Sequence, residues 1–388
     1  MKYKLSEIAL FNPTETLKKG TLAKKVGMDK LQPFCRDIPD YEIAEFSGGM
    51  KFRNGDTIMA RITPCLENGK TAKVNILDTE EVGFGSTEYI VFRAIDGVTD
   101  EDYLYYLVCS PIVRDIAIKS MVGSSGRQRV QTDVVKGIEV ELPTLDEQRK
   151  IGSVLKILDD KIAVNNEINE NLLNQALTLY ATQFSSLELN GCIGDYCSVK
   201  SGFAFKSSWW TNCGVRVIKI GSINQDNLNL LECSYVDEDK ADKAKDFVVK
   251  AGDLLIAMTG ATIGKFAMVP YSSEVLLVNQ RVGKFFLGNN PVEKLPFIYC
   301  TLKQPEVYGE VVNRGQGSAQ PNISASDIMS IPCVIPSQDA INDFNDTSQP
   351  LFDLIISNQQ ENQQLSELRN VLLPKLMSGE LDVSVIDL

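Results

Sequence analysis

The segment Pro143–Phe184 constrains the fold most, because it reads as one long amphipathic helix with no internal proline. Thr144 is followed three residues later by Glu147, which is the capping-box spacing of a helix start. Apolar residues then recur at alternating intervals of four and three, the heptad pattern of a helix that packs along one seam against another helix. The predicted seam consists of Ile151, Leu155, Leu158, Ile162, Asn165, Asn169, Leu172, Ala176 and Leu179.

A diverged copy of this segment, Ser337–Gly379, closes the sequence. An offset of 193 residues, as from Ile151 to Phe344, aligns the two segments without a gap. The offset also places both seam asparagines on asparagines, at Asn358 and Asn362. Seam asparagines usually fix the register of a coiled coil, although solvated asparagines on an exposed helix face are the ordinary alternative. The predicted seam of the second helix consists of Leu351, Ile355, Asn358, Asn362, Leu365 and Leu372.

Two substitutions distinguish the second helix from the first. Ala340 stands where the capping-box glutamate would be, and Pro350 lies inside the helical pattern. A proline there removes a backbone donor and clashes with the preceding turn. We therefore expect this helix to be kinked or divided near Pro350.

The sequence outside the helices is duplicated as well. Gly55-Asp56 and the β-rich run after it recur as Gly252-Asp253, and the basic loop Gly123–Gln131 is answered by Arg314–Ser324. A repeat of whole segments indicates a duplicated architecture. We expect an α+β fold in which two mixed α/β domains, each a twisted β-sheet with helices, are separated by two long helices packed as an antiparallel coiled coil with an internal pseudo-two-fold duplication. The expected parts are a first domain at residues 1–143, a central helix at 144–184, a second domain at 185–336, and a C-terminal helix and tail at 337–388.

The composition excludes several classes of function. The sequence has no histidine, so Ser-His or Cys-His nucleophilic catalysis is impossible. Its nine cysteines include no Cys-x-x-Cys pair, so we expect no metal site. No apolar window is long enough to span a membrane, and the first residues lack the apolar core of a signal peptide, so we expect a cytoplasmic protein that contacts no membrane.

Two motifs suggest a nucleotide or a catalytic site and are better explained otherwise. Gly260–Lys265 resembles a phosphate loop, but it has one residue too few between its glycines and Phe266 where serine or threonine is needed. Asp56 and Asp253 invite a carboxylate-based nuclease, yet aspartate is ordinary in a Gly-Asp turn. The sequence also lacks an Asn/Asp-Pro-Pro-aromatic tetrad, so we expect no methylation by this chain alone.

The net charge of −12 argues against nucleic acid only at first sight. Residues 337–388 carry nine acidic and two basic groups, which is more than half of the excess. The two predicted domains are close to neutral, so local basic faces are possible on them.

Along nearly its whole length the chain resembles the specificity (S) subunit of type I restriction–modification systems. The matching pieces are ARITPCLENGK, GSSGRQRV, LPTLDEQRKI, SGFAFKS, GDLLIAMTGATIGK and LRNVLLPKLMSGEL, in this order. The resemblance implies two target-recognition domains that each read one half of a bipartite double-stranded DNA site. It also implies that the helices act as a spacer and dock methyltransferase subunits, two in number, and that motor/nuclease subunits join the full complex. S-adenosylmethionine is then expected on the methyltransferase subunit, and no cofactor on this chain, which is expected to be non-catalytic.

Candidate DNA contacts are polar or basic residues in loops, because arginine can donate to guanine and glutamine can pair with adenine. In the first domain they are Arg61, Lys70, Arg127, Gln128 and Arg129; in the second they are Lys206, Lys219, Lys265, Asn279, Gln280, Arg281, Arg314, Gln316 and Gln320. The ordinary alternatives are salt-bridged arginines in surface loops and, for Arg61, an ion pair inside the domain. Trp209 and Trp210 could stack on DNA, or could belong to the core.

The sequence therefore predicts a DNA-reading subunit without catalytic activity of its own. The alternative function is a non-catalytic coiled-coil scaffold that binds proteins through its two domains.

Overall fold

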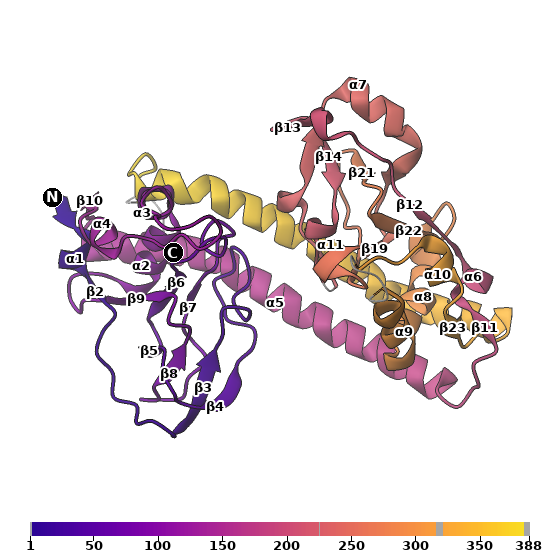
Figure 1. Cartoon of the computed structure of the whole chain (residues 1–388), viewed down its shortest axis with the longest axis horizontal. Helices are drawn as coiled ribbons and strands as arrows, with labels where there is room; N and C mark the ends of the chain where they lie inside the picture. Colours follow the sequence, from indigo (N-terminus) through magenta and orange to yellow (C-terminus); the bar gives the residue numbers. More distant parts are fainter. Residues whose placement is uncertain (1, 225, 316–320, 384–388) are drawn as a thin grey trace. The chain divides into compact units, whose positions relative to one another are not determined.

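The computed structural model describes residues 2–224, 226–315 and 321–383, and the chain divides into two compact units (Figure 1). Unit 1 comprises Met1–Ala163 and Leu365–Leu388, and unit 2 comprises Val164–Gln364. The division passes through both long helices. Each unit therefore contains one globular part together with a segment of each helix.

The long helices are α5 (Leu145–Phe184) and α11 (Gln338–Met377), of 40 residues each. The predicted capping box starts α5, since the Thr144 backbone N–H donates to Glu147 at 2.8 Å and the Glu147 N–H donates to Thr144 Oγ1 at 3.4 Å. The predicted division of α11 at Pro350 is wrong, because the helix is continuous through that residue. Phe344 and Phe352 are fully buried on either side of the proline, and such packing outweighs helix propensity.

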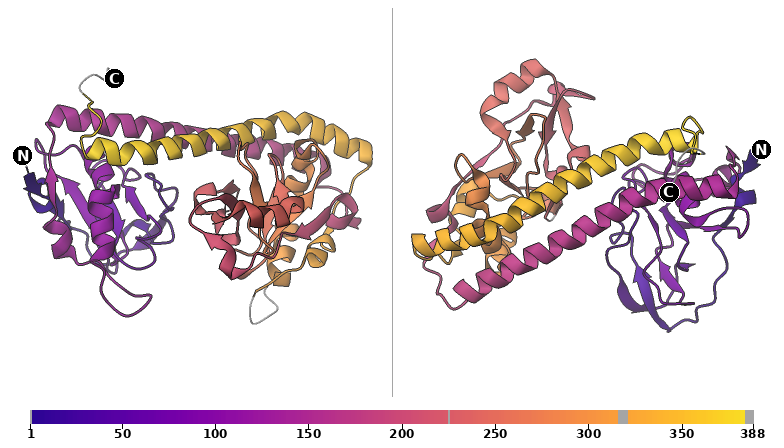
Figure 2. Two further views of the ribbon diagram at one scale, coloured as in Figure 1. Left: turned by 90° about the horizontal axis from the view of Figure 1, so that it is seen from above. Right: turned by 180° about the vertical axis from the view of Figure 1, so that it is seen from behind.

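In unit 2 the two helices pack antiparallel, as predicted (Figure 2). Asn165 donates to the side-chain oxygen of Asn362 at 2.9 Å, and Asn358 donates to that of Asn169 at 2.8 Å. Each asparagine of α5 thus meets the duplicate of the other one, which is the pairing that a pseudo-two-fold axis produces. The predicted register is confirmed by these two amide pairs.

In unit 1 the same two helices meet through a buried ion pair. Arg369 of α11 donates to Asp159 Oδ1 of α5 at 2.5 Å, and the Tyr106 hydroxyl donates to Asp159 Oδ2 at 2.6 Å. Nearby, Ile151 and Leu155 of α5 share an apolar core with α11. The predicted seam residues Leu158, Ile162 and Leu365 are half-buried.

The globular part of unit 1 contains two four-stranded sheets. One has the order β2-β9-β6-β7 and is antiparallel, and the other has the order β4-β3-β8-β5 with a parallel β3–β8 pair. A short β1-β10 pair joins the two ends of this part. The strands are β1 (Lys2–Lys4), β2 (Ala9–Phe11), β3 (Leu22–Val26), β4 (Glu42–Glu45), β5 (Met50–Phe52), β6 (Thr57–Ala60), β7 (Thr71–Lys73), β8 (Gly83–Gly85), β9 (Tyr89–Ala94) and β10 (Glu139–Glu141). The helices are α1 (Leu5–Ile8), α2 (Glu101–Cys109), α3 (Pro111–Lys119) and α4 (Thr132–Lys136).

Unit 2 repeats the two-sheet plan of unit 1 and adds strands to it. Its sheets have the orders β12-β22-β19-β20 and β13-β17-β14-β21-β18, again with one parallel pair, β14–β21. The strands are β11 (Gly191–Cys192), β12 (Ser198–Ser201), β13 (Trp210–Thr211), β14 (Val215–Ile218), β15 (Ile223–Asn224), β16 (Asn227–Leu228), β17 (Ser234–Val236), β18 (Val248–Val249), β19 (Leu254–Ala257), β20 (Phe266–Met268), β21 (Leu276–Val278), β22 (Val282–Phe286) and β23 (Pro332–Cys333). The α-helices are α6 (Ile193–Tyr196), α7 (Glu238–Ala241), α8 (Leu295–Leu302), α9 (Pro305–Gly315) and α10 (Ala325–Met329). The predicted duplication is confirmed by this common topology.

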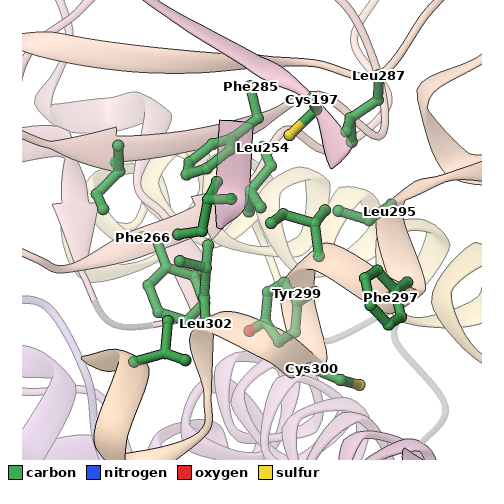
Figure 3. Close-up of a cluster of buried hydrophobic side chains, with 14 of the residues drawn as sticks. Cys197, Leu254, Phe266, Phe285, Leu287, Leu295, Phe297, Tyr299, Cys300 and Leu302 are labelled. Carbon is green, nitrogen blue, oxygen red and sulfur yellow. The ribbon is translucent and has the colours of Figure 1, made fainter. Parts of the chain in front are cut away.

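The core of unit 2 connects the sheet to the long helices. Phe266 and Phe285 of the β12-β22-β19-β20 sheet and Phe297 and Tyr299 of α8 are fully buried in one cluster (Figure 3). Tyr299 also packs edge-on against Phe352 of α11, with ring centroids 5.4 Å apart. The sheet, α8 and the helix pair therefore form one folded body within this unit.

The two Gly-Asp turns that could have suggested a nuclease have a structural explanation. Asp56 and Asp253 are buried. Arg93 Nε donates to Asp56 at 2.7 Å, and Lys284 Nζ donates to Asp253 at 2.6 Å. In each unit the aspartate ties the start of one central strand to the neighbouring strand.

Candidate nucleic-acid interface

In unit 1 the predicted contact residues gather around the loop Gly123–Gln131, which follows α3. Val122 and Arg129 exchange both backbone hydrogen bonds, at 2.9 and 3.0 Å, and so close the loop. Gly123 and Gly126 have φ values of 138° and 75°, which favour glycine and let the chain reverse within a few residues. Arg127 lies at the exposed tip, free to meet a ligand.

The base of this loop is joined to the end of the central strand β6. The Thr63 N–H donates to the Gln128 carbonyl at 3.0 Å, and the Val130 N–H donates to the Arg61 carbonyl at 2.8 Å. Three of the predicted residues, Arg61, Gln128 and Arg129, are thereby held together.

Glu88, which was not predicted from the sequence, organises the two arginines at this base. Arg129 Nε donates to Glu88 at 3.0 Å and Arg129 Nη2 at 2.7 Å, while Arg61 Nε lies 3.6 Å from the same carboxylate. The hydrogen bond from Arg129 holds the pKa of Glu88 below its ordinary value. The ion pair inside the domain, given above as the alternative for Arg61, is thus present, and Arg127 is the arginine of the loop left for a ligand.

Lys70, the fifth predicted residue of unit 1, has a different environment. Its ammonium group donates to the Met28 carbonyl at 2.8 Å, and its side chain is half-buried. A contact between Lys70 and DNA stays a prediction. Its duplicate Lys265 is also half-buried, beside β20.

In unit 2 the corresponding loop follows α9. The Gly260 N–H donates to the Pro321 carbonyl at 3.0 Å, and the Ile323 N–H donates to the Met258 carbonyl at 2.9 Å. Arg314 Nη1 donates to Ser330 at 2.7 Å and its Nε to Glu310 at 3.0 Å, so this arginine connects α9 to α10. The predicted contacts Gln316 and Gln320 lie outside the described residues.

The predicted contacts Asn279, Gln280 and Arg281 form a turn between β21 and β22. Asn279 is buried, and its side-chain oxygen accepts from the Arg281 N–H at 3.2 Å, so it shapes the turn. Gln280 and Arg281 are exposed on the turn.

A second basic surface of unit 2 surrounds its two tryptophans. The Lys219 ammonium lies 3.8 Å from the centre of the Trp210 ring, and partial burial lowers its pKa. Three more ammonium groups surround the Trp209 ring. The distance from the ring centre is 5.7 Å for Lys206, 5.3 Å for Lys243 and 6.0 Å for Lys240. Lys240 and Lys243 were not predicted from the sequence, because they come from a separate segment that only the fold brings to the tryptophan.

The tryptophans themselves belong partly to a small core. Both are half-buried and pack with Phe203, Phe205 and Phe247. The core alternative for this stretch is therefore present, and the lysines lie around its rim. Ammonium groups over indole rings make a surface that suits a phosphate backbone.

Comparison with known proteins identifies the architecture. The family model of the type I restriction modification DNA specificity domain matches residues 1–174 and again residues 189–367. The chain belongs to this family. The two matched segments correspond to the two halves of the duplication.

Individual relatives span both halves as well. The MjaIX specificity subunit of Methanocaldococcus jannaschii, a type I restriction enzyme component, is 26% identical over 313 residues, covering 74% of this chain and 70% of the relative. The HindI specificity subunit of Haemophilus influenzae is 22% identical over 418 residues, covering 85% and 87%. The crystal structure of the type I S subunit from M. genitalium has a TM-score of 0.50 at 14% identity and covers 97% of this chain and 96% of that one, which supports the fold.

Two further observations bear on the excluded functions. In the part of the chain that the structure describes, no group of three or more Cys, Asp or Glu side chains is placed to hold a metal ion. Within the same residues, no helix combines the length and the apolar character that crossing a bilayer requires.

Proposed function

We propose that this chain is the DNA specificity subunit of a type I restriction–modification complex. Each globular domain reads one half of a two-part duplex site, and α5 and α11 separate the domains and dock methyltransferase subunits. The observation that carries the proposal is that the base of the loop and the neighbouring turn have matching main-chain hydrogen bonds in the two units but different side chains. A protein that reads two different half-sites requires this combination.

The chemistry of the exposed residues fits base reading by loops. Arg127, Gln280 and Arg281 are hydrogen-bond donors on turns, and arginine can bind guanine O6 and N7 through two hydrogen bonds. Lysines such as Lys206 and Lys243 lack that geometry and suit phosphate contacts, which position the protein without reading sequence.

The catalytic steps belong to partners in this proposal. We propose that the chain itself is non-catalytic and holds no cofactor, that two methyltransferase subunits carry S-adenosylmethionine, and that motor/nuclease subunits complete the assembly. The absence of histidine and of a methyltransferase tetrad in the sequence supports this division.

The test is a selection from a randomised DNA library by the complex of this chain with a methyltransferase subunit of its own system. Enrichment of a two-part motif with a fixed gap is the expected result. Replacing residues 1–143 by the first domain of another family member should then change one half of the motif and leave the other unchanged. A stable complex that enriches no motif would refute the proposal and favour the scaffold alternative.

A further inference from the structure

The duplication identifies which side chains occupy equivalent places in the two units. In unit 1 the Arg61 N–H donates to the Glu88 carbonyl at 2.9 Å, and in unit 2 the Met258 N–H donates to the Arg281 carbonyl at 3.0 Å. These bonds lie at the same ends of the corresponding strand pairs β6–β9 and β19–β22. Arg61 therefore corresponds to Met258, and Glu88 corresponds to Arg281.

A third pair of equivalent residues comes from the loops. Ile62 forms an antiparallel bridge with Arg129, and Thr259 forms the same bridge with Asn322. Arg129 and Asn322 thus occupy equivalent positions in the two units. One backbone carries two different sets of three side chains.

The two sets have the same net charge but opposite arrangements. In unit 1 two arginines surround one carboxylate, because Arg129 and Arg61 both approach Glu88. In unit 2 a single arginine, Arg281, takes the place of the carboxylate beside uncharged neighbours. Each site therefore carries one net positive charge, and attraction to phosphates does not distinguish them.

What differs is the number of free donors at each site. Arg129 uses its Nε and Nη2 on Glu88. The Arg281 side chain is exposed and makes no hydrogen bond or ion pair with the residues that the structure describes. Its planar group is free to donate two parallel hydrogen bonds.

We infer that the position immediately before β9 and β22 determines base preference in each unit: Arg281 reads a guanine directly, whereas Glu88 is a positioning residue that holds Arg129 and leaves reading to the loop tip. This inference rests on the proposed function, since it assigns residues within the same DNA interface. It places a direct base contact of unit 2 in the β21–β22 turn, outside the loop Arg314–Ser324.

Substitutions at the two positions test the inference in the complex with the methyltransferase subunit. Arg281→Ala and Arg281→Lys should each lower discrimination for guanine at one base of one half-site by about tenfold or more, because lysine keeps the charge but lacks the rigid planar fork with which arginine matches the guanine edge. Glu88→Gln should change base preference in the other half-site only, because it releases Arg129. Lys294→Gln and Glu139→Gln, at exposed positions, are the matched controls and should leave both halves unchanged.

The readout is the selected motif, with circular dichroism confirming that each variant is folded. Arg281→Lys keeps the test decisive even where the alanine variant is unstable. A wild-type complex that selects a two-part motif, together with variants that select the same motif, would overturn this inference and leave the proposed function standing. A wild-type complex that selects nothing would instead overturn the proposed function.

Discussion

The buried ion pair between Asp159 of α5 and Arg369 of α11 joins the two long helices within unit 1, and its removal is the most direct test of what stabilises this unit. The side chains are 5% and 10% exposed, and the Tyr106 hydroxyl completes the carboxylate's hydrogen bonds. Removing Arg369 by an Arg369→Ala substitution leaves the aspartate buried without its cation. Such a loss costs about 3–5 kcal/mol of unfolding free energy.

In unit 2 the equivalent positions, between the two long helices and α8, carry no charged side chain. At the 193-residue offset, Asp159, Arg369 and Tyr106 correspond to Phe352, Ala176 and Tyr299, all of which are fully buried. Replacing a buried ion pair by well-packed apolar groups of similar volume is often neutral or stabilising. We therefore expect the triple variant Asp159→Phe/Arg369→Ala/Tyr106→Phe to recover most of the loss, the last change removing a hydroxyl that has lost its carboxylate acceptor.

Hydrogen exchange followed by mass spectrometry measures this locally, since it gives an opening free energy for each segment. Peptides from α2 should exchange faster in Arg369→Ala and near the wild-type rate in the triple variant. Peptides from α8 in unit 2 provide the internal control. A loss below about 1 kcal/mol in the single variant would refute the reasoning from an unpaired buried charge. A triple variant as unstable as the single one would refute the equivalence of these three positions in the two units.

Three further predictions concern the interface and the helix seam. Arg127→Ala should weaken discrimination at one base of one half-site by about 1–3 kcal/mol, measured by competition between site variants; equal losses on all sequences would show a phosphate contact instead. Because Arg129 holds the pKa of Glu88 below its ordinary value, the contribution of this carboxylate is complete above the pKa of an unfolded glutamate and is lost as the pH falls through the lower folded value. Wild type and Glu88→Gln should therefore converge in urea unfolding on acidification from pH 7, and a constant difference down to pH 3 would contradict this. Asn165→Ala should lower the opening free energy of the helix pair in unit 2 by about 1–3 kcal/mol, since it removes a buried amide pair, whereas the exposed Asn171→Ala should not.

The helices and the duplication were predictable because their signals are local and repeated. The heptad spacing from Ile151 onward needs only the sequence, and an offset of 193 residues preserves it in the second helix. The capping box at Thr144 is a three-residue signal of the same kind. Pro350 misled the prediction, since the helix around it is maintained by tertiary packing, which local propensity does not contain.

The candidate interface was predictable only in part. Arg127 and Arg281 are exposed, as residue type and loop position suggested. The role of Glu88 depends on a contact across 41 residues of sequence, and no periodic pattern marks it. Comparing the two halves of the repeat residue by residue does provide a signal, because a carboxylate in one half stands where an arginine stands in the other.

The loop anchors have a consequence for how such a protein changes over evolutionary time. At both loops the bonds that fix the base join main-chain atoms, from Val130 to Arg61 in one unit and from Ile323 to Met258 in the other. Main-chain bonds survive the exchange of one side chain for another. The surface residues of a loop or turn can therefore drift or recombine while the scaffold beneath them keeps its stability, so that a new DNA target becomes reachable through a few substitutions and without an intermediate that fails to fold.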